Sequence, residues 1–107
     1  MNEENKILTY IGFSVKSGNI VYGLDKANEY KGKAYLAIAS NTLSERSLRA
    51  AVDFAEKKKC PVLKSVSRSV EELTRRKNCK FIALTDKNLS RAILDNVRTD
   101  FVYIGRQ

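Results

Sequence analysis

The sequence predicts an α/β protein folded as a three-layer α/β/α sandwich around a mixed sheet of about four strands. The first reason is alternation: segments whose apolar residues follow a helical spacing alternate with short β-favouring segments. The second is residues 34–39, whose continuous apolar run is typical of a strand buried on both faces. A chain of 107 residues fits one core. We therefore expect a single domain over residues 1–107.

The first half of the chain predicts two helices and two strands. Ile7, Ile11 and Val15 belong to one helical stripe. Gly18 ends it, since glycine meets no steric penalty in the left-handed conformation that follows many helices. Gly23 opens the next helix with its backbone N–H groups uncovered. In chain order, the expected elements are a helix at 6–16, a strand at 20–22, a helix at 24–30 and a strand at 34–39.

The second half continues the alternation and supplies three helix starts. Thr42 with Glu45, and Ser69 with Glu72, match the capping box, in which each side chain accepts a hydrogen bond from the other residue's backbone N–H. Asp86 is a third candidate cap. The expected elements are a helix at 42–59, a strand at 62–66, a helix at 69–76, a strand at 80–85, a helix at 86–97, and a tail at 100–104 that is either an edge strand or a packed extension.

Basic residues are concentrated in one part of the chain. The net charge is +8, and residues 57–107, with thirteen Lys/Arg and five Asp/Glu, account for all of it. The densest stretch is 57–80, with nine basic and two acidic residues. Such a concentration indicates a polyanionic partner. A solvated surface that favours solubility is the alternative explanation of the charge.

The residue inventory argues against an enzyme. The chain has no histidine, which is the commonest general base and metal ligand, and it has neither a phosphate loop nor a nucleophile elbow. Cys60 and Cys79 are isolated, which predicts reduced thiols in a cytoplasmic protein without a metal site. No apolar run approaches the length of a membrane span. We therefore expect no catalysis, no cofactor and no membrane partner.

One feature fits a different class of protein. Asp86 follows the strand expected at 80–85, a position where acidic residues bind metals or accept phosphate in receiver-like α/β domains. A helix cap explains the same residue without a further assumption. We therefore interpret Asp86 as a cap.

The turns after the first and third strands form the candidate binding site. They comprise residues 23–26 and 66–69, both open a helix, and in a sheet of this order they can lie at the same edge. Lys26, Lys64 and Arg68 add positive charge nearby. Such groups suit structured RNA, which phosphate contacts position and side-chain contacts to base edges specify. The alternative is that the glycine is only a tight turn and the serine only a cap.

Several short motifs follow one another along roughly residues 6–97. They are Ile11-Gly12, Ser17-Gly18, Gly23, the run Lys33 to Ala39, Cys60-Pro61-Val62, Val66-Ser67-Arg68-Ser69 and the run Phe81 to Asp86. As an ordered set they resemble bacterial members of the ribosomal L-seven-Ae/L-thirty-e family, whose kin bind kink-turn RNA. The resemblance implies an α/β/α sandwich. It also implies that Gly23, Leu24, Asp25 and Lys26 would meet the kinked backbone and the sheared G·A pairs, and that Val66, Ser67 and Arg68 would pack against the extruded base.

One pair departs from the family pattern. Where kink-turn readers have Asn-Glu-x-x-Lys, this chain has Asp25-Lys26-x-x-Glu29, which reverses the charges. Two hypotheses follow. The first is a non-enzymatic, cytoplasmic RNA-binding protein of the ribosomal type, part of a ribonucleoprotein, that recognises kink-turn-like ribosomal or ribosome-associated RNA and not DNA, with the ribosome as candidate partner. The alternative is a protein-interaction module that kept the fold and lost kink-turn specificity.

Overall fold

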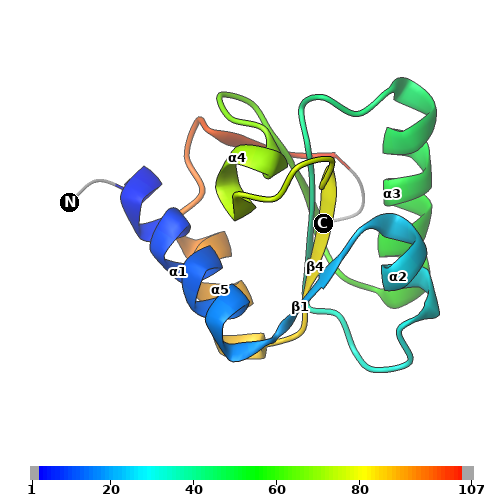
Figure 1. The fold of residues 1–107 in the computed structure, drawn as a ribbon, viewed down its shortest axis with the longest axis horizontal. Coiled ribbons are helices and arrows are strands. Elements are labelled where there is room, and N and C mark those ends of the chain that lie inside the picture. Colours follow the sequence, from blue (N-terminus) through cyan, green and yellow to red (C-terminus); the bar gives the residue numbers. More distant parts are fainter. Residues whose placement is uncertain (1–2, 105–107) are drawn as a thin grey trace.

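A computed structural model describes residues 3–104 of the chain. In this range five helices alternate with five strands (Figure 1). The helices are α1 (Glu3–Ser17), α2 (Leu24–Glu29), α3 (Glu45–Lys58), α4 (Val70–Thr74) and α5 (Lys87–Asp95), and the strands are β1 (Ile20–Tyr22), β2 (Leu36–Ala39), β3 (Val62–Ser65), β4 (Phe81–Leu84) and β5 (Phe101–Tyr103). The predicted helices and strands are present with ends shifted by a few residues, while the first two and last three residues of the predicted domain lie outside the described range.

The strands form one mixed sheet in the order β1-β4-β2-β3-β5. Strands β2 and β3 are parallel, with Ala39 beside Lys64, and the other neighbouring pairs are antiparallel. The α/β class is confirmed, but the expected number of strands was wrong. The sheet has five strands because residues 101–103 pair with β3 and become an edge strand. Their side chains alternate too weakly for the sequence alone to separate a strand from a packed extension.

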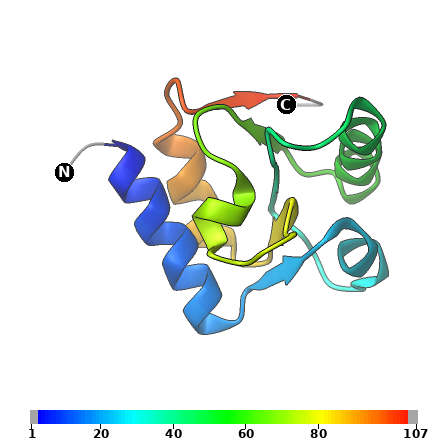
Figure 2. The same cartoon turned by 45° about the horizontal axis from the view of Figure 1, so that its top comes forward.

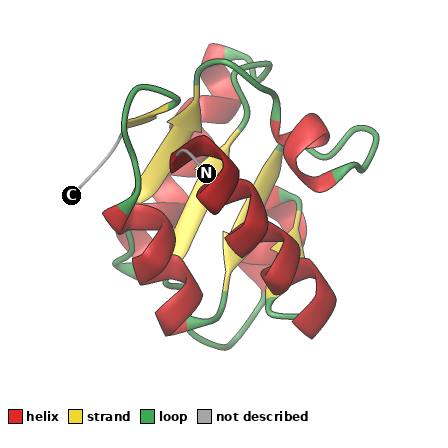
Figure 3. Ribbon diagram, turned by 90° about the vertical axis from the view of Figure 1, so that its left-hand side faces the viewer, coloured by secondary structure: helices red, strands yellow, loops and turns green. Residues whose placement is uncertain are grey.

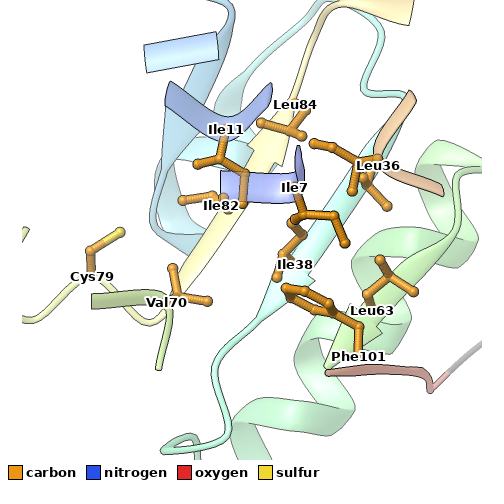
Figure 4. Packing of buried hydrophobic residues seen from close by; sticks show 11 residues of the cluster. Ile7, Ile11, Leu36, Ile38, Leu63, Val70, Cys79, Ile82, Leu84 and Phe101 are labelled. Atoms are coloured by element: carbon orange, nitrogen blue, oxygen red, sulfur yellow. The ribbon is translucent and has the colours of Figure 1, made fainter. Parts of the chain in front are cut away.

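Helices lie on both faces of the sheet, and the alternation of side chains along β2 decides which helices pack where. Leu36 and Ile38 point to the face covered by α1, α4 and α5, whereas Ala37 and Ala39 point to the face covered by α2 and α3. Figure 3 shows α1 and α5 in front of the strands. The first cluster consists mainly of branched aliphatic residues (Figure 4). The second is rich in alanine, so α3 approaches the sheet closely and Phe54 meets Phe81 edge-on, with ring centroids 5.4 Å apart.

The three predicted helix starts have different outcomes. The capping box of Ser69 and Glu72 is confirmed, since both of its hydrogen bonds are present. Asp86 is confirmed as a cap, because its carboxylate accepts from the N–H of Leu89 at 2.8 Å. The box predicted for Thr42 was wrong: α3 begins later, and the hydroxyl of Ser44 caps it by accepting from the N–H of Ser47. The hydroxyl of Thr42 instead lies beside that of Ser40 and donates to the carboxylate of Glu71 in α4.

Both cysteines are buried and carry free thiols. Cys79 belongs to the cluster beneath α1, α4 and α5, and Cys60 belongs to the cluster beneath α2 and α3, so the sheet separates them. Desolvation by burial raises the pKa of both thiols, which keeps them protonated at neutral pH. Among residues 3–104 no three His, Cys, Asp or Glu side chains are grouped to hold a metal ion. No helix in the same range is long and apolar enough to cross a bilayer.

Candidate nucleic-acid interface

Five connections meet at one end of the sheet, which we call the turn end. They are the β1–α2 turn at Gly23, the β2–α3 connection at 40–44, the β3–α4 turn at 66–69, the α4–β4 loop at 75–80 and the α5–β5 connection at 96–100. Three backbone hydrogen bonds, each 2.8 Å long, close this end: Gly23 N donates to Phe81 O, Ser40 N to Lys80 O, and Val66 N to Asp100 O. The β2–α3 and β3–α4 connections are seen together at the top of Figure 1. The two predicted turns therefore lie at the same end of the sheet.

The separation of the two predicted turns follows from the strand order. Gly23 directly follows β1 and Val66 directly follows β3, and β4 and β2 lie between these strands. Three strand spacings amount to roughly 14 Å. The turns are thus too far apart to touch, but they lie on one surface that a folded ligand can span.

Gly23 gives the β1–α2 turn its shape. Its φ of 87° and ψ of 148° lie in a region that residues with a Cβ rarely adopt. No side chain caps the first turn of α2, so the backbone N–H groups of this turn make no capping bond within the described residues. Leu24 is half-buried, while Asp25 and Lys26 are exposed beside it. Glu29 ends α2 at the far side, about 9 Å along the helix axis from Gly23.

A pocket of about 160 Å³ opens beside this turn. It lies between the start of α2, the start of α3 and the start of β4, and it is lined by Gly23, Leu24, Leu43, Ser47, Asn78, Lys80 and Phe81. Its wall is mostly apolar, with the hydroxyl, amide and ammonium groups of three side chains around it. Such a mixture can hold a flat, partly polar group.

The β3–α4 turn is held by hydrogen bonds to two other connections. The side-chain amide of Asn41 donates to Val66 O at 2.9 Å. The hydroxyl of Ser67 donates to the carboxylate of Asp100 at 3.0 Å. Val66 nevertheless leaves 48% of its surface exposed. Arg68 is half-buried and lines a narrow apolar hollow on the α1 side of the sheet.

Ser40 ties the turn end together, and the sequence analysis missed this role. Its buried hydroxyl accepts from the N–H of Val70 at 3.1 Å and from the N–H of Thr42 at 3.3 Å. It also lies 2.8 Å from the hydroxyl of Thr42, which in turn donates to Glu71 at 3.2 Å. The end of β2, the β2–α3 connection and the start of α4 therefore share one hydroxyl. In the sequence, a serine after a strand predicts only a turn.

The α4–β4 loop is the second feature that the sequence analysis missed. Arg75 and Asn78 both have left-handed backbone conformations, with φ of 57° and 62°. The guanidinium of Arg76 lies over the ring of Tyr22, 3.8 Å from its centroid, so the loop covers β1 next to Gly23. Lys80 is exposed at the start of β4. The basic stretch was a visible signal, but only the pairing of β4 with β1 shows that it adjoins the first turn.

Lys64 does not lie where the sequence analysis expected. It points toward α3, where it lines an open hollow of about 440 Å³ with Arg49 and Asp53. Arg68 lines a hollow on the opposite face of the sheet, beside Ile7. The alternation of side chains along β3 causes this separation, because Lys64 shares a face with Val62 and not with Leu63.

The basic stretch 57–80 is also divided between the two ends of the molecule. Lys57, Lys58 and Lys59 lie at the C-terminal end of α3, away from the turn end, and the ammonium of Lys58 donates to Tyr30 O at 2.7 Å. The α4–β4 loop, with Arg75, Arg76, Lys77 and Lys80, lies at the turn end. One continuous charged segment therefore gives two separate basic surfaces.

Comparisons with known proteins bear on the fold. No family model matches the chain, and none of the curated proteins matches it. Among solved structures, one described as "a protein with unknown function from Bacillus halodurans C" is similar, with a TM-score of 0.75 and 17% sequence identity. The match covers 85% of this chain and 95% of that one. At this level of identity the likeness shows a shared fold alone.

Proposed function

We propose that this chain is a non-enzymatic RNA-binding protein of the ribosomal type, a member of the L-seven-Ae/L-thirty-e family with a three-layer α/β/α sandwich. Its ligand is kink-turn-like structured RNA in a ribonucleoprotein such as the ribosome. The observation that carries the proposal is the turn end, where two helix-opening turns and a cationic loop lie on one surface. This arrangement combines backbone donors with positive charge, as RNA recognition requires.

The α4–β4 loop and the start of α2 supply the contacts to the sugar–phosphate backbone. Arg75, Lys77 and Lys80 are exposed at the turn end, and Lys26 is exposed on α2. Lysine acts as a flexible point charge toward phosphate, which suits a contact that positions RNA without reading its sequence. The N–H groups that open α2 donate to a phosphate oxygen or to an acceptor atom on a base edge.

The pocket beside Gly23 and the β3–α4 turn supply two places for unpaired bases. Asn78 and Ser47 offer hydrogen bonds to the edge of a base that enters the pocket against Phe81. The exposed surface of Val66 offers an apolar face on which a second base packs, with Arg68 beside it. A regular RNA duplex presents no extruded base, so these contacts favour RNA with bulges or kinks.

The reversed charge pair changes the recognition in a specific way. Asp25 is exposed at the start of α2, where its carboxylate accepts hydrogen bonds from the amino and imino groups of a guanine edge. Glu29 ends α2 and is thereby kept about 9 Å from Gly23, farther from the proposed phosphate path than Lys26.

Arg68→Ala tests the proposal. We expect a loss of about tenfold or more in affinity for a kink-turn RNA, and a smaller loss for a plain duplex of equal length, because the arginine is assigned to an unpaired base. Lys57→Ala removes the same charge at the opposite end of the molecule and serves as the matched control. Fluorescence anisotropy at several salt concentrations measures both affinities and the number of phosphate contacts. Equal losses on both RNAs would reduce the β3–α4 turn to a nonspecific contact.

A second candidate is a protein-interaction module that kept the fold and lost kink-turn specificity. The observation that favours it is the presence of carboxylates at the turn end: Asp25, Glu71 and Asp100 lie among the proposed contacts. These groups repel phosphate but can pair with a basic protein surface. A tagged chain that recovers one protein partner after nuclease treatment, with no affinity for structured RNA, would favour this candidate.

A further inference from the structure

Strand β5 is an open edge of the sheet. Among residues 3–104 it pairs only with β3, on one side, because it is last in the strand order. Two backbone hydrogen bonds fix its orientation: Val66 N donates to Asp100 O, and Ile104 N donates to Val62 O. Residues 100, 102 and 104 therefore bond to β3. In an antiparallel ladder the intervening residues point their N–H and C=O groups the other way, so those of Phe101 and Tyr103 face outward.

The two edges of the sheet differ in their protection. The opposite edge, β1, is half-buried along its length, and the guanidinium of Arg76 covers Tyr22. In β5, by contrast, Val102 and Tyr103 are 45% and 41% exposed. Edge strands are ordinarily protected from pairing with another chain by charged residues, proline or a bulge. Residues 101–103 contain no charge and no proline. Figure 2 shows β5 along the upper edge of the molecule.

We propose that β5 pairs antiparallel with the β5 of a second copy of this chain, across a two-fold axis. The two-fold register that uses the outward groups of both Phe101 and Tyr103 in each copy is the one centred on Val102. Phe101 of one copy then bonds with Tyr103 of the other. Val102 lies on the axis opposite the second copy's Val102, as a non-hydrogen-bonded pair whose Cα atoms are about 4.5 Å apart.

The side chains support this self-pairing on both faces of the sheet. Val102 is paired in register with Lys64, so it points to the α3 side, where two valines meet on the axis. Phe101 belongs to the cluster on the other side, so Tyr103 of one copy lies beside Phe101 of the other on that face. Apolar and aromatic cross-strand pairs of this kind stabilise a sheet.

The charge next to β5 also permits a second copy to approach. The hollow between α3 and β5 is lined by two acidic residues, Glu45 and Asp53, and two basic residues, Arg49 and Lys64. Its charges therefore balance, although the chain as a whole carries +8. A balanced flank avoids the repulsion that two strongly basic surfaces would experience. The edge is short, so we expect a weak, concentration-dependent dimer.

Oxidative crosslinking of Val102→Cys tests this geometry directly. The two native thiols are buried, so the new thiol is the accessible one, and a separation of about 4.5 Å between Cα atoms lies within the range of disulfides. Val66→Cys is the matched control, because Val66 is similarly exposed, at 48%, but follows β3 on the inner side of β5 and is not on the outward edge that would meet the second copy. The protein is treated with nuclease first, so that RNA does not bridge two copies.

The expected result is a covalent dimer of Val102→Cys under mild oxidation, whereas Val66→Cys stays monomeric. Light scattering of the unmodified chain should show a mass that rises with concentration, and Val102→Lys should abolish that rise while its circular dichroism spectrum is unchanged. A chain that is monomeric up to about 1 mM, crosslinking that is equally fast at both positions, or a dimer that survives Val102→Lys would overturn the proposal. None of these outcomes depends on RNA binding.

Discussion

At the scale of single residues, the buried hydroxyl of Ser40 sets the geometry of the turn end. Ser40 is fully buried, and two backbone N–H groups, those of Thr42 and Val70, donate to its side chain. A donor that is buried without an acceptor costs far more than a hydrogen bond contributes in net terms. Ser90 is a natural contrast: it is equally buried, but its hydroxyl has no partner among the residues that the structure describes.

We expect Ser40→Ala to lower the free energy of unfolding by about 1–3 kcal/mol, because the buried N–H of Val70 and the part-buried N–H of Thr42 lose their acceptor. Urea unfolding followed by circular dichroism measures the change. Ser90→Ala is the control, and we expect it to be neutral or slightly stabilising, since it removes a polar group without a partner and places a better helix former in α5. If both variants lose the same free energy of unfolding, the hydrogen bonds to the Ser40 hydroxyl do not specifically stabilise the turn end.

At the scale of secondary-structure elements, the boundary between β1 and α2 depends on the backbone conformation of a glycine. Gly23 has a φ of 87°, yet a Cβ there would meet no heavy atom within 4 Å. Any cost of adding a methyl group is therefore backbone strain and not a clash. Gly12 lies inside α1 with equally open space around it, but its φ is not in the positive range. The two glycines thus differ in backbone conformation alone.

We expect Gly23→Ala to destabilise the fold by about 1–3 kcal/mol, through strain at the start of α2. Gly12→Ala should have the opposite sign and stabilise α1 by roughly 0.5–1 kcal/mol, since alanine is the better helix former. Thermal unfolding of both variants provides the comparison. A neutral Gly23→Ala would mean that α2 can begin with an ordinary backbone conformation, and that the turn proposed to meet RNA is not fixed by its glycine.

The distribution of charge matters at the scale of the whole molecule. The sequence places nine basic residues within residues 57–80, but the fold sends Lys57, Lys58 and Lys59 to one end and the α4–β4 loop to the other. Of these two groups of basic residues, only the α4–β4 loop belongs to the proposed RNA site. Charge reversals at the two ends should therefore have unequal effects.

We expect the double variant Lys77→Glu with Lys80→Glu to weaken RNA binding and to reduce the slope of log affinity against log salt by about 1.5, equivalent to two phosphate contacts. The matched variant, Lys31→Glu with Lys57→Glu, makes the same change in net charge away from the turn end and should leave the slope nearly unchanged. Anisotropy titrations across a salt series decide between them. Equal slopes for the two variants would indicate that RNA binding follows net charge and has no defined surface.

Much of the fold could be predicted because local signals were strong. The apolar run at 34–39, the capping box of Ser69 and Glu72 and the cap of Asp86 each depend on neighbours within four residues. The prediction failed for Thr42, since its hydroxyl bonds to Ser40 and Glu71 across the turn end. Ser40 is only two positions away but lies before the predicted cap, and Glu71 is 29 positions away, so capping patterns contain no information about either partner.

The candidate site was predictable only in part for the same reason. Gly23, Leu24, Asp25, Lys26, Val66, Ser67 and Arg68 lie at the turn end, as the sequence analysis expected. Lys64 was expected to add charge near the two turns, and its side chain lies on the opposite face of the sheet from Arg68. The α4–β4 loop was not included at all, because its nearness to Gly23 depends on the pairing of β4 with β1.

The sequence by itself determined which segments are helices and strands, where most of them begin, and that the chain contains no histidine. These properties arise from backbone preferences and from side chains a few positions apart. Only the tertiary structure decided the strand order, the fifth strand, the face on which each basic residue lies and the hydroxyl that joins the turns. The physical reason is that these features depend on hydrogen bonds and packing between residues that are twenty or more positions apart, and a single sequence does not record which of them meet.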